Sequence, residues 1–98
     1  MVYTLLVNVK VKPERTDSVR TLLAKASSVY TQDKGTLSWF VMQSAKTPTE
    51  FAIVERYESK ADLQTHIKNP FYAEFGKTVG PWLDGELNIQ HFEEISRL

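Results

Sequence analysis

Cysteine is absent from this 98-residue sequence, and its absence removes several classes of function at once. Without cysteine the chain has no disulfide framework, no thiolate nucleophile and no zinc or iron–sulfur site built on thiolates. A chain that uses no disulfide fits a reducing compartment, so we expect a cytoplasmic protein.

An excess of charge of one sign is also lacking, because 12 basic residues balance 12 acidic ones. Domains that bind nucleic acids or anionic membrane surfaces normally carry a positive excess. No apolar run approaches the roughly 18 residues that span a bilayer, and residues 1–7 alternate like a strand rather than like a signal peptide. We therefore expect neither nucleic acid nor membrane as a partner.

Glycine and histidine are scarce as well. The four glycines are scattered singly at turns, so there is no glycine-rich loop for phosphate. The two histidines, His66 and His91, show neither HxH nor HxxxH spacing, which argues against a dedicated metal site. We expect no metal and no cofactor, and His91 reads as a surface or interface residue.

What is present is an alternation of strands and helices that fills one domain, residues 1–98. Period-two alternation predicts strands, and apolar residues at helical spacing predict helices. In chain order we predict strand Tyr3–Val11, helix Glu14–Gln32, strands Thr36–Ser44 and Glu50–Glu58, a helix broken at Asn69–Pro70 that ends near Lys77, and strand Glu86–Ile95. This order predicts an α+β fold, the ferredoxin-like split βαβ with a four-stranded antiparallel sheet.

The two middle strands are apolar on both sides. In the segment Trp39–Met42, for example, every residue is apolar, so both faces of that strand are. Helices on one side of a sheet cover only one of its faces, and a solvated face should be polar. A second copy of the chain is the simplest cover for the other face, so we predict a homodimer that forms through the sheet.

His66 is the first candidate for chemistry. It follows Leu63 by three residues and precedes Ile67, which places it on the apolar face of the predicted helix. An imidazole in that position can act as acid, base or hydrogen-bond donor near neutral pH. A partly buried histidine bonded to a backbone carbonyl would show the same pattern.

Glu55 is the second candidate. It shares strand parity with Phe51, Ile53 and Tyr57, so its carboxylate is predicted to be buried and must be paired or protonated. Two readings remain open: an acid or base that works with His66, and a structural ion pair, for example with Arg56 of a second copy.

Other residues are candidates for a binding pocket. Asn8 is a polar side chain in the first strand that could point into a cavity or bond to a neighbouring strand. Aromatic residues make up 11% of the chain and could surround a flat apolar ligand, although helical spacing of aromatics usually means core packing. The aromatic candidates are Trp39, Tyr57, Tyr72, Phe75 and Trp82.

The segment Phe51–Ser59, followed by Ala61, His66 and Pro70–Tyr72, resembles the signature of the antibiotic biosynthesis monooxygenase (ABM) family. Gly35–Trp39 is similar to the family's second strand, and Val11–Pro13 to its exit from the first strand. The resemblance covers nearly the whole chain. It implies a dimeric α+β barrel in which each subunit holds a cavity between sheet and helices.

The branches of the family imply different activities. Haem-degrading members carry an iron-ligating histidine near the position of Gly76, and polyketide-oxidising members carry an asparagine where this chain has Ile53. The quinol-oxidising and isomerase branches share the spacing of Glu55 and His66. The resemblance therefore implies a cofactor-independent monooxygenase of a phenolic or quinol-type substrate. Alternatives are an isomerase or cyclase of a small ketone, and a non-catalytic dimer that binds a small hydrophobic molecule.

Overall fold

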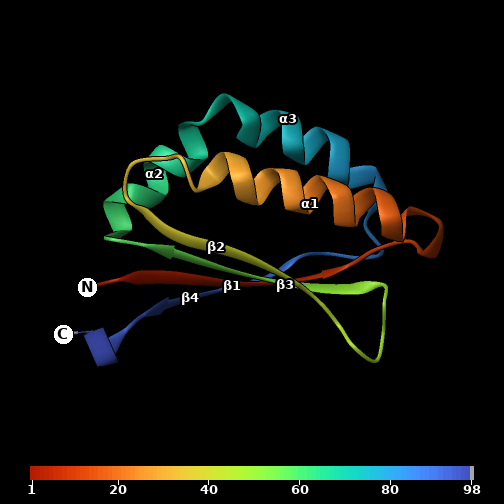
Figure 1. The fold of residues 1–98 in the computed structure, drawn as a ribbon, viewed down its shortest axis with the longest axis horizontal. Coiled ribbons are helices and arrows are strands. Elements are labelled where there is room, and N and C mark those ends of the chain that lie inside the picture. Colours follow the sequence, from red (N-terminus) through yellow and green to blue (C-terminus); the bar gives the residue numbers. More distant parts are fainter. Residues whose placement is uncertain (98) are drawn as a thin grey trace.

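The computed structural model describes residues 1–97 and has two layers, a sheet and a layer of helices on one of its faces (Figure 1). The strands are β1 (Tyr3–Lys10), β2 (Thr36–Gln43), β3 (Glu50–Tyr57) and β4 (Asn88–Glu93), in the order β2-β3-β1-β4 with antiparallel pairing. The helices are α1 (Thr16–Tyr30), α2 (Lys60–Lys68) and α3 (Pro70–Val79). This is the predicted α+β arrangement, which is confirmed.

The sheet is built around β1 and β3, which pair over their whole lengths from Tyr3 opposite Tyr57 to Lys10 opposite Glu50. Along β3 the residues alternate between buried and half-buried, as the period of a strand requires. The odd-numbered residues of β1 and β3 face the helices and form the inner face of the sheet, and the even-numbered residues form the outer face.

Helix α1 covers the sheet with a stripe of buried residues at spacings of four and three. These residues are Val19, Leu23, Ala26 and Tyr30. The predicted helix started at Glu14, but the chain first makes a 3₁₀ turn over Pro13–Arg15, and α1 begins at Thr16. The fixed backbone angle of Pro13 suits this first turn.

The predicted break between the two short helices is confirmed. Asn69 ends α2, and its side-chain Oδ1 accepts a hydrogen bond of 3.0 Å from the backbone N–H of Phe71 at the start of α3. Pro70 occupies the first helical position, where its missing N–H leaves no bond unmade. The chain thereby changes direction, and α3 runs beside α1 (Figure 1).

The last strand is shorter than predicted. The pattern indicated Glu86–Ile95, whereas β4 covers Asn88–Glu93 and then passes into a 3₁₀ turn at Ile95–Arg97. All six residues of β4 are exposed, because β4 is an edge strand that the helices do not cover. Its inner side is therefore open beside the core.

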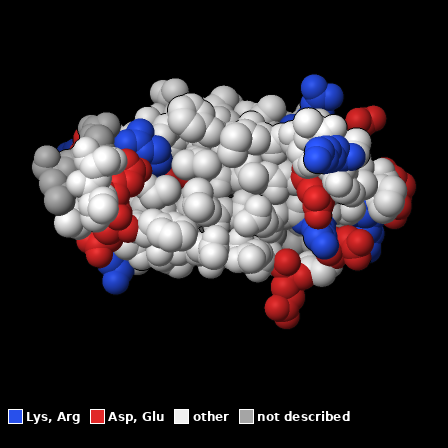
Figure 2. Space-filling view, turned by 90° about the horizontal axis from the view of Figure 1, so that it is seen from below, with Lys and Arg blue, Asp and Glu red and all other residues white. Residues whose placement is uncertain are grey.

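The outer face of the sheet has an uncharged middle between two charged ends (Figure 2). At one end Lys10 lies 3.7 Å from Glu50, and at the other Arg56 makes two hydrogen bonds of 2.7 and 2.9 Å to Glu94. The middle carries half-buried and exposed apolar side chains, among them Leu6, Phe40, Met42 and Val54. The expectation that the second and third strands are apolar on both sides is met by β2 and β3, whereas β1 and β4 also place Asn8, Asn88 and Gln90 on the outer face.

Among residues 1–97, the structure has no helix that combines the length and the apolar character needed to cross a membrane.

The close approach of Gly35 to the side chain of Asp62 offers a test of the fold. Its φ is +88°, a conformation that favours glycine, and a Cβ atom added there would lie 2.7 Å from Cβ of Asp62 and closer still to its carboxylate. Rotating Asp62 cannot relieve the contact with its Cβ. We expect Gly35→Ala to lower the free energy of unfolding by about 1–3 kcal/mol, measured by chemical denaturation.

Gly76→Ala is the matched control. Gly76 lies inside α3 and an added Cβ would meet no atom within 4 Å, so alanine should stabilise the helix by up to about 1 kcal/mol. Equal effects of the two substitutions would contradict the packing described for Gly35.

Candidate active site

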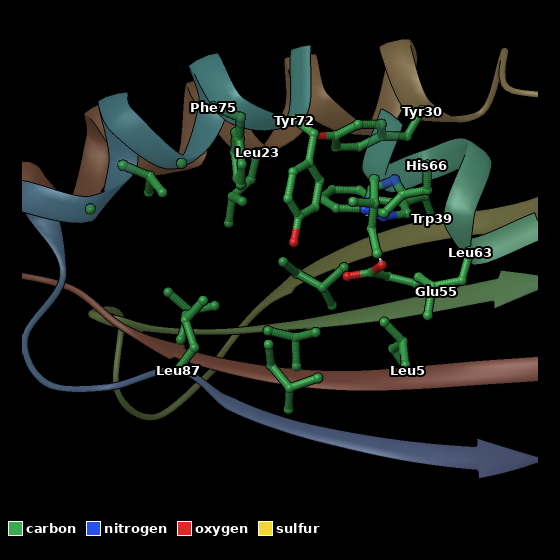
Figure 3. Close-up of a pocket in the computed structure, with 18 of the residues that line it drawn as sticks. Leu5, Leu23, Tyr30, Trp39, Glu55, Leu63, His66, Tyr72, Phe75 and Leu87 are labelled. Carbon is green, nitrogen blue, oxygen red and sulfur yellow. Dashed lines mark ion pairs between the residues drawn. The ribbon is translucent and has the colours of Figure 1, made fainter. Parts of the chain in front are cut away.

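A pocket of about 340 Å³ lies between the inner face of the sheet and helices α2 and α3 (Figure 3). Its volume is at the lower end of the range for sites that hold small organic ligands. Most of its wall is apolar, and it extends from the core under α2 to the inner side of β4. Apolar residues of the wall include Leu5, Val7, Leu23, Ile53, Val79 and Ile89.

Glu55 and His66 meet at the buried end of this pocket. Glu55 projects from the inner face of β3, and α2 places His66 over it, with His66 Nε2 3.6 Å from Glu55 Oε1. The two residues are only 5% and 4% exposed. Glu55 is buried, as its strand parity predicted, and His66 lies buried on the apolar face of α2, while their role remains a prediction.

Burial disfavours the charged forms of both groups. Burial lowers the pKa of His66 from 6.5 to about 4, so the imidazole is neutral at pH 7. Burial also raises the pKa of Glu55, and the hydrogen bond from Tyr57 acts in the opposite direction. The arrangement thus places a neutral base, the imidazole of His66, next to the carboxyl group of Glu55. Once the imidazole takes up a proton, the carboxylate of Glu55 can form an ion pair with it.

Aromatic rings enclose the imidazole of His66. The centroids of the Tyr30, Tyr72 and Tyr57 rings lie 4.2, 5.2 and 5.6 Å from that of His66, and Trp39 lies at 6.4 Å. Burial also raises the pKa values of Tyr30 and Tyr57, which stay protonated. These rings keep water away from the Glu55–His66 pair.

Three polar atoms near the pair have no hydrogen-bond partner within the described part of the chain. They are the hydroxyl of Tyr30, Nε1 of Trp39 and Nδ1 of His66, and all three are buried. Unpaired buried polar groups are uncommon in folded proteins, because each costs about 1–3 kcal/mol. All three residues line the pocket, which is the arrangement expected of a site that bonds to a polar ligand.

Three of the aromatic candidates line the pocket, namely Trp39, Tyr72 and Phe75. Figure 3 shows the ring of Tyr72 descending from α3 toward the sheet, with its hydroxyl in the space between them. Tyr57 is fully buried and does not line the pocket; its hydroxyl donates a hydrogen bond of 2.6 Å to Glu55 Oε1. Tyr57 therefore acts on the site through Glu55.

Asn8 and Trp82 do not lie at this pocket. Asn8 has even parity on β1, so it lies exposed on the outer face and lines a separate, shallower hollow there. Trp82 follows α3 in a 3₁₀ turn and packs under the guanidinium of Arg15, 5.3 Å from its ring centroid, outside the pocket wall. Strand parity alone could have excluded Asn8, because it is opposite to that of Leu5 and Val7.

Two polar residues of the pocket were missed at the level of sequence. Tyr30 ends the apolar stripe of α1, and its position there could have indicated that it reaches the site. His91 is exposed, as expected of a surface residue, but it also lines the pocket from β4. Its parity matches that of Ile89, but only the strand order shows that this side of β4 faces the pocket.

Within residues 1–97 there is no group of three or more histidine, aspartate and glutamate side chains placed to hold a metal ion.

The buried imidazole predicts a pH dependence of stability. Between pH 6.5 and about 4 the unfolded chain binds a proton at His66 that the folded chain excludes. Stability from this residue is therefore complete above pH 6.5 and falls on acidification by about 3 kcal/mol. Denaturant unfolding of the wild type and of His66→Gln across this range measures the difference.

Glu55 contributes with the opposite sign, because its raised pKa favours the folded chain when protonated. The comparison with His66→Gln cancels this contribution. An identical slope of stability against pH in both proteins would show that His66 is not buried as a neutral base.

Comparison with solved structures shows the same fold in proteins of low sequence identity. A candidate antibiotic biosynthesis monooxygenase from Nitrosomonas europaea superposes with a TM-score of 0.92 at 21% identity, covering 96% of this chain and 90% of that one. A protein from Mycobacterium tuberculosis gives 0.89 at 21% identity, with 97% and 96% covered. A conserved protein from Methanosarcina mazei gives 0.90 at 19% identity, with 96% and 93% covered.

No curated protein matches the chain. The family model described as antibiotic biosynthesis monooxygenase matches residues 2–78, which include the whole segment that carries the resemblance in the sequence. The chain therefore belongs to the antibiotic biosynthesis monooxygenase family.

Proposed function

We propose that this protein oxygenates a phenolic or quinol-type aromatic molecule in the pocket between sheet and helices, without a bound cofactor. The observation that carries the proposal is the neutral imidazole of His66 beside the carboxyl group of Glu55 at the buried end of an apolar pocket. His66 Nε2 lies 3.6 Å from Glu55 Oε1. The cysteine-free sequence fits a reaction in the cytoplasm.

The first step is removal of a proton from the substrate hydroxyl. His66 is neutral at pH 7 and can accept this proton, and the imidazolium that forms gains an ion pair with Glu55. Tyr57 holds Glu55 in place through its hydrogen bond of 2.6 Å. Burial makes the charged pair far more favourable than an isolated imidazolium at the same position.

The electrons for the oxygenation come from the substrate itself. The electron-rich phenolate ring carbon forms a bond to one atom of dioxygen and becomes a hydroperoxide. The O–O bond then breaks as the C–H proton on the same carbon leaves, giving a carbonyl and one water molecule. Dioxygen thus takes up four electrons, one of its atoms enters the product, and the substrate is oxidised to a quinone.

The walls of the pocket support this chemistry by orienting the ring and excluding water. Trp39 and Phe75 offer flat apolar surfaces. The hydroxyl of Tyr72 points into the space and can bond to a substrate oxygen. The hydroxyl of Tyr30, buried and without a partner in the described chain, can do the same.

The proposal includes a homodimer that forms through the outer face of the sheet. The uncharged middle of this face, between the Lys10–Glu50 and Arg56–Glu94 ion pairs, has the composition of an interface core with a charged rim (Figure 2). Exposed apolar side chains on it, such as Met42 and Phe40, are 46% and 58% accessible. A symmetric second copy would cover both.

The enzymatic part is tested with 1,4-dihydroxynaphthalene as substrate. We expect oxygen uptake above the uncatalysed rate, and a fall in kcat/KM by about 10²–10³ in His66→Ala, because the general base is lost. Thr65→Ala is the matched control, since Thr65 is the exposed neighbour of His66 on α2. An oxygen electrode measures the rates, and mass spectrometry with labelled dioxygen follows one labelled atom into the product.

A rate equal to background, or one that His66→Ala leaves unchanged, would remove the proposal. Turnover of a small ketone that persists without oxygen would instead identify an isomerase or cyclase. Binding of the naphthalenediol without any turnover would identify a binding protein.

The dimer is tested by placing a charge in the middle of the outer face. Met42→Glu and Phe40→Glu each put a carboxylate on an exposed position, so the protomer should stay folded while a dimer loses a buried apolar contact. We expect the wild type to sediment as a dimer and both variants to shift toward the monomer by at least tenfold in Kd. Ala73→Glu on the exposed side of α3 is the control, and a monomeric wild type contradicts the prediction.

A further inference from the structure

A second polar site lies at the other end of the same pocket, on the edge strand. Trp39 pairs with Glu55, Glu55 with Leu5 and Leu5 with His91, so the four residues form one row across β2, β3, β1 and β4. Directly paired residues of an antiparallel sheet point to the same face. Glu55 and His91 therefore lie on the same floor, with Leu5 between them.

The imidazole of His91 is held in a defined orientation. The hydroxyl of Tyr3 lies 2.7 Å from His91 Nδ1, and the two rings meet edge to face with centroids 5.7 Å apart. The bond to Tyr3 occupies Nδ1 and leaves Nε2 as the ring nitrogen that can meet a ligand. When the Tyr3 hydroxyl donates to Nδ1, Nε2 carries the hydrogen and can donate it to a ligand oxygen.

The distance between the two polar ends limits the kind of ligand that can reach both. Neighbouring strands are about 4.8 Å apart, so Glu55 on β3 and His91 on β4 are separated by about 10 Å. The floor between and beside them is apolar, formed by Leu5, Val7 and Ile89. An aromatic molecule with oxygens at opposite ends, each making a hydrogen bond of about 2.8 Å, is long enough to reach both ends.

We propose that His91, oriented by Tyr3, binds a second oxygen of the substrate, which is therefore an aromatic molecule with oxygens at opposite ends. One oxygen lies at the Glu55–His66 pair and the other at His91 Nε2. The inference rests on the proposed function, because it takes an aromatic molecule as the occupant of this pocket. It adds a specificity-determining residue and a second polar group on the substrate.

The test compares two ligands that differ only in the second oxygen, 2,6-dihydroxynaphthalene and 2-naphthol. Affinities are measured by calorimetry without oxygen, so that no turnover interferes. We expect the wild type to bind the diol about tenfold more tightly, the gain from one additional hydrogen bond. In His91→Ala this preference should fall to about one, while the affinity for 2-naphthol stays unchanged.

Glu93→Ala is the matched control, because Glu93 is exposed on the same side of β4 and does not line the pocket. It should keep the tenfold preference. Tyr3→Phe keeps the ring but removes the hydroxyl, and we expect it to lower the preference less than His91→Ala does. An unchanged preference in Tyr3→Phe would overturn the orienting role of Tyr3.

The proposal is overturned by a wild type that binds both ligands equally or binds neither. A preference that survives in His91→Ala also overturns it, as does one that disappears in His91→Ala and Glu93→Ala alike. The result is independent of the oxygenation test. A preference that depends on His91, found in a protein without oxygen uptake, would leave the second polar site standing and remove only the proposed reaction.

Discussion

The site depends on placing an imidazole and a carboxyl group together where almost no water reaches. An isolated charge at either position would cost several kcal/mol, so the resting state keeps the imidazole of His66 neutral and ties Glu55 to Tyr57. The same burial gives the pair its chemical use. A proton that arrives on His66 creates two opposite charges 3.6 Å apart, and their attraction offsets the cost of burying them.

The fold supplies this arrangement with two simple devices. The break at Asn69–Pro70 gives two short helices in place of one long one, so that α2 carries His66 over β3 while α3 carries Tyr72 and Phe75 over the middle of the pocket. The helices also stop short of β4, which leaves the inner side of that strand open. A ligand can therefore contact the core at one end and an edge strand at the other.

The two faces of the sheet serve different purposes through the same strands. On β3 the inner face carries Glu55 between Ile53 and Tyr57, and the outer face carries Ala52 and Val54. A second copy on the outer face would contact β3, the strand that carries Glu55, on the side opposite the pocket. The proposed dimer and the proposed chemistry are connected in this way, because catalysis requires a base and its partner held in fixed geometry.

Local pattern in the sequence determined the succession of strands and helices along the chain and the break at Asn69–Pro70. It also determined that β2 and β3 are apolar on both sides and that Glu55 and His66 are buried. Each of these follows from alternation, helical spacing or the backbone limits of proline, which act between near neighbours. Only the tertiary structure decided that Asn8 and Trp82 lie away from the pocket, that Tyr57 acts through Glu55, and that Tyr30 and His91 belong to the site. These placements depend on strand order and on where the helices end across the sheet, and contacts between distant segments have no signal in local periodicity.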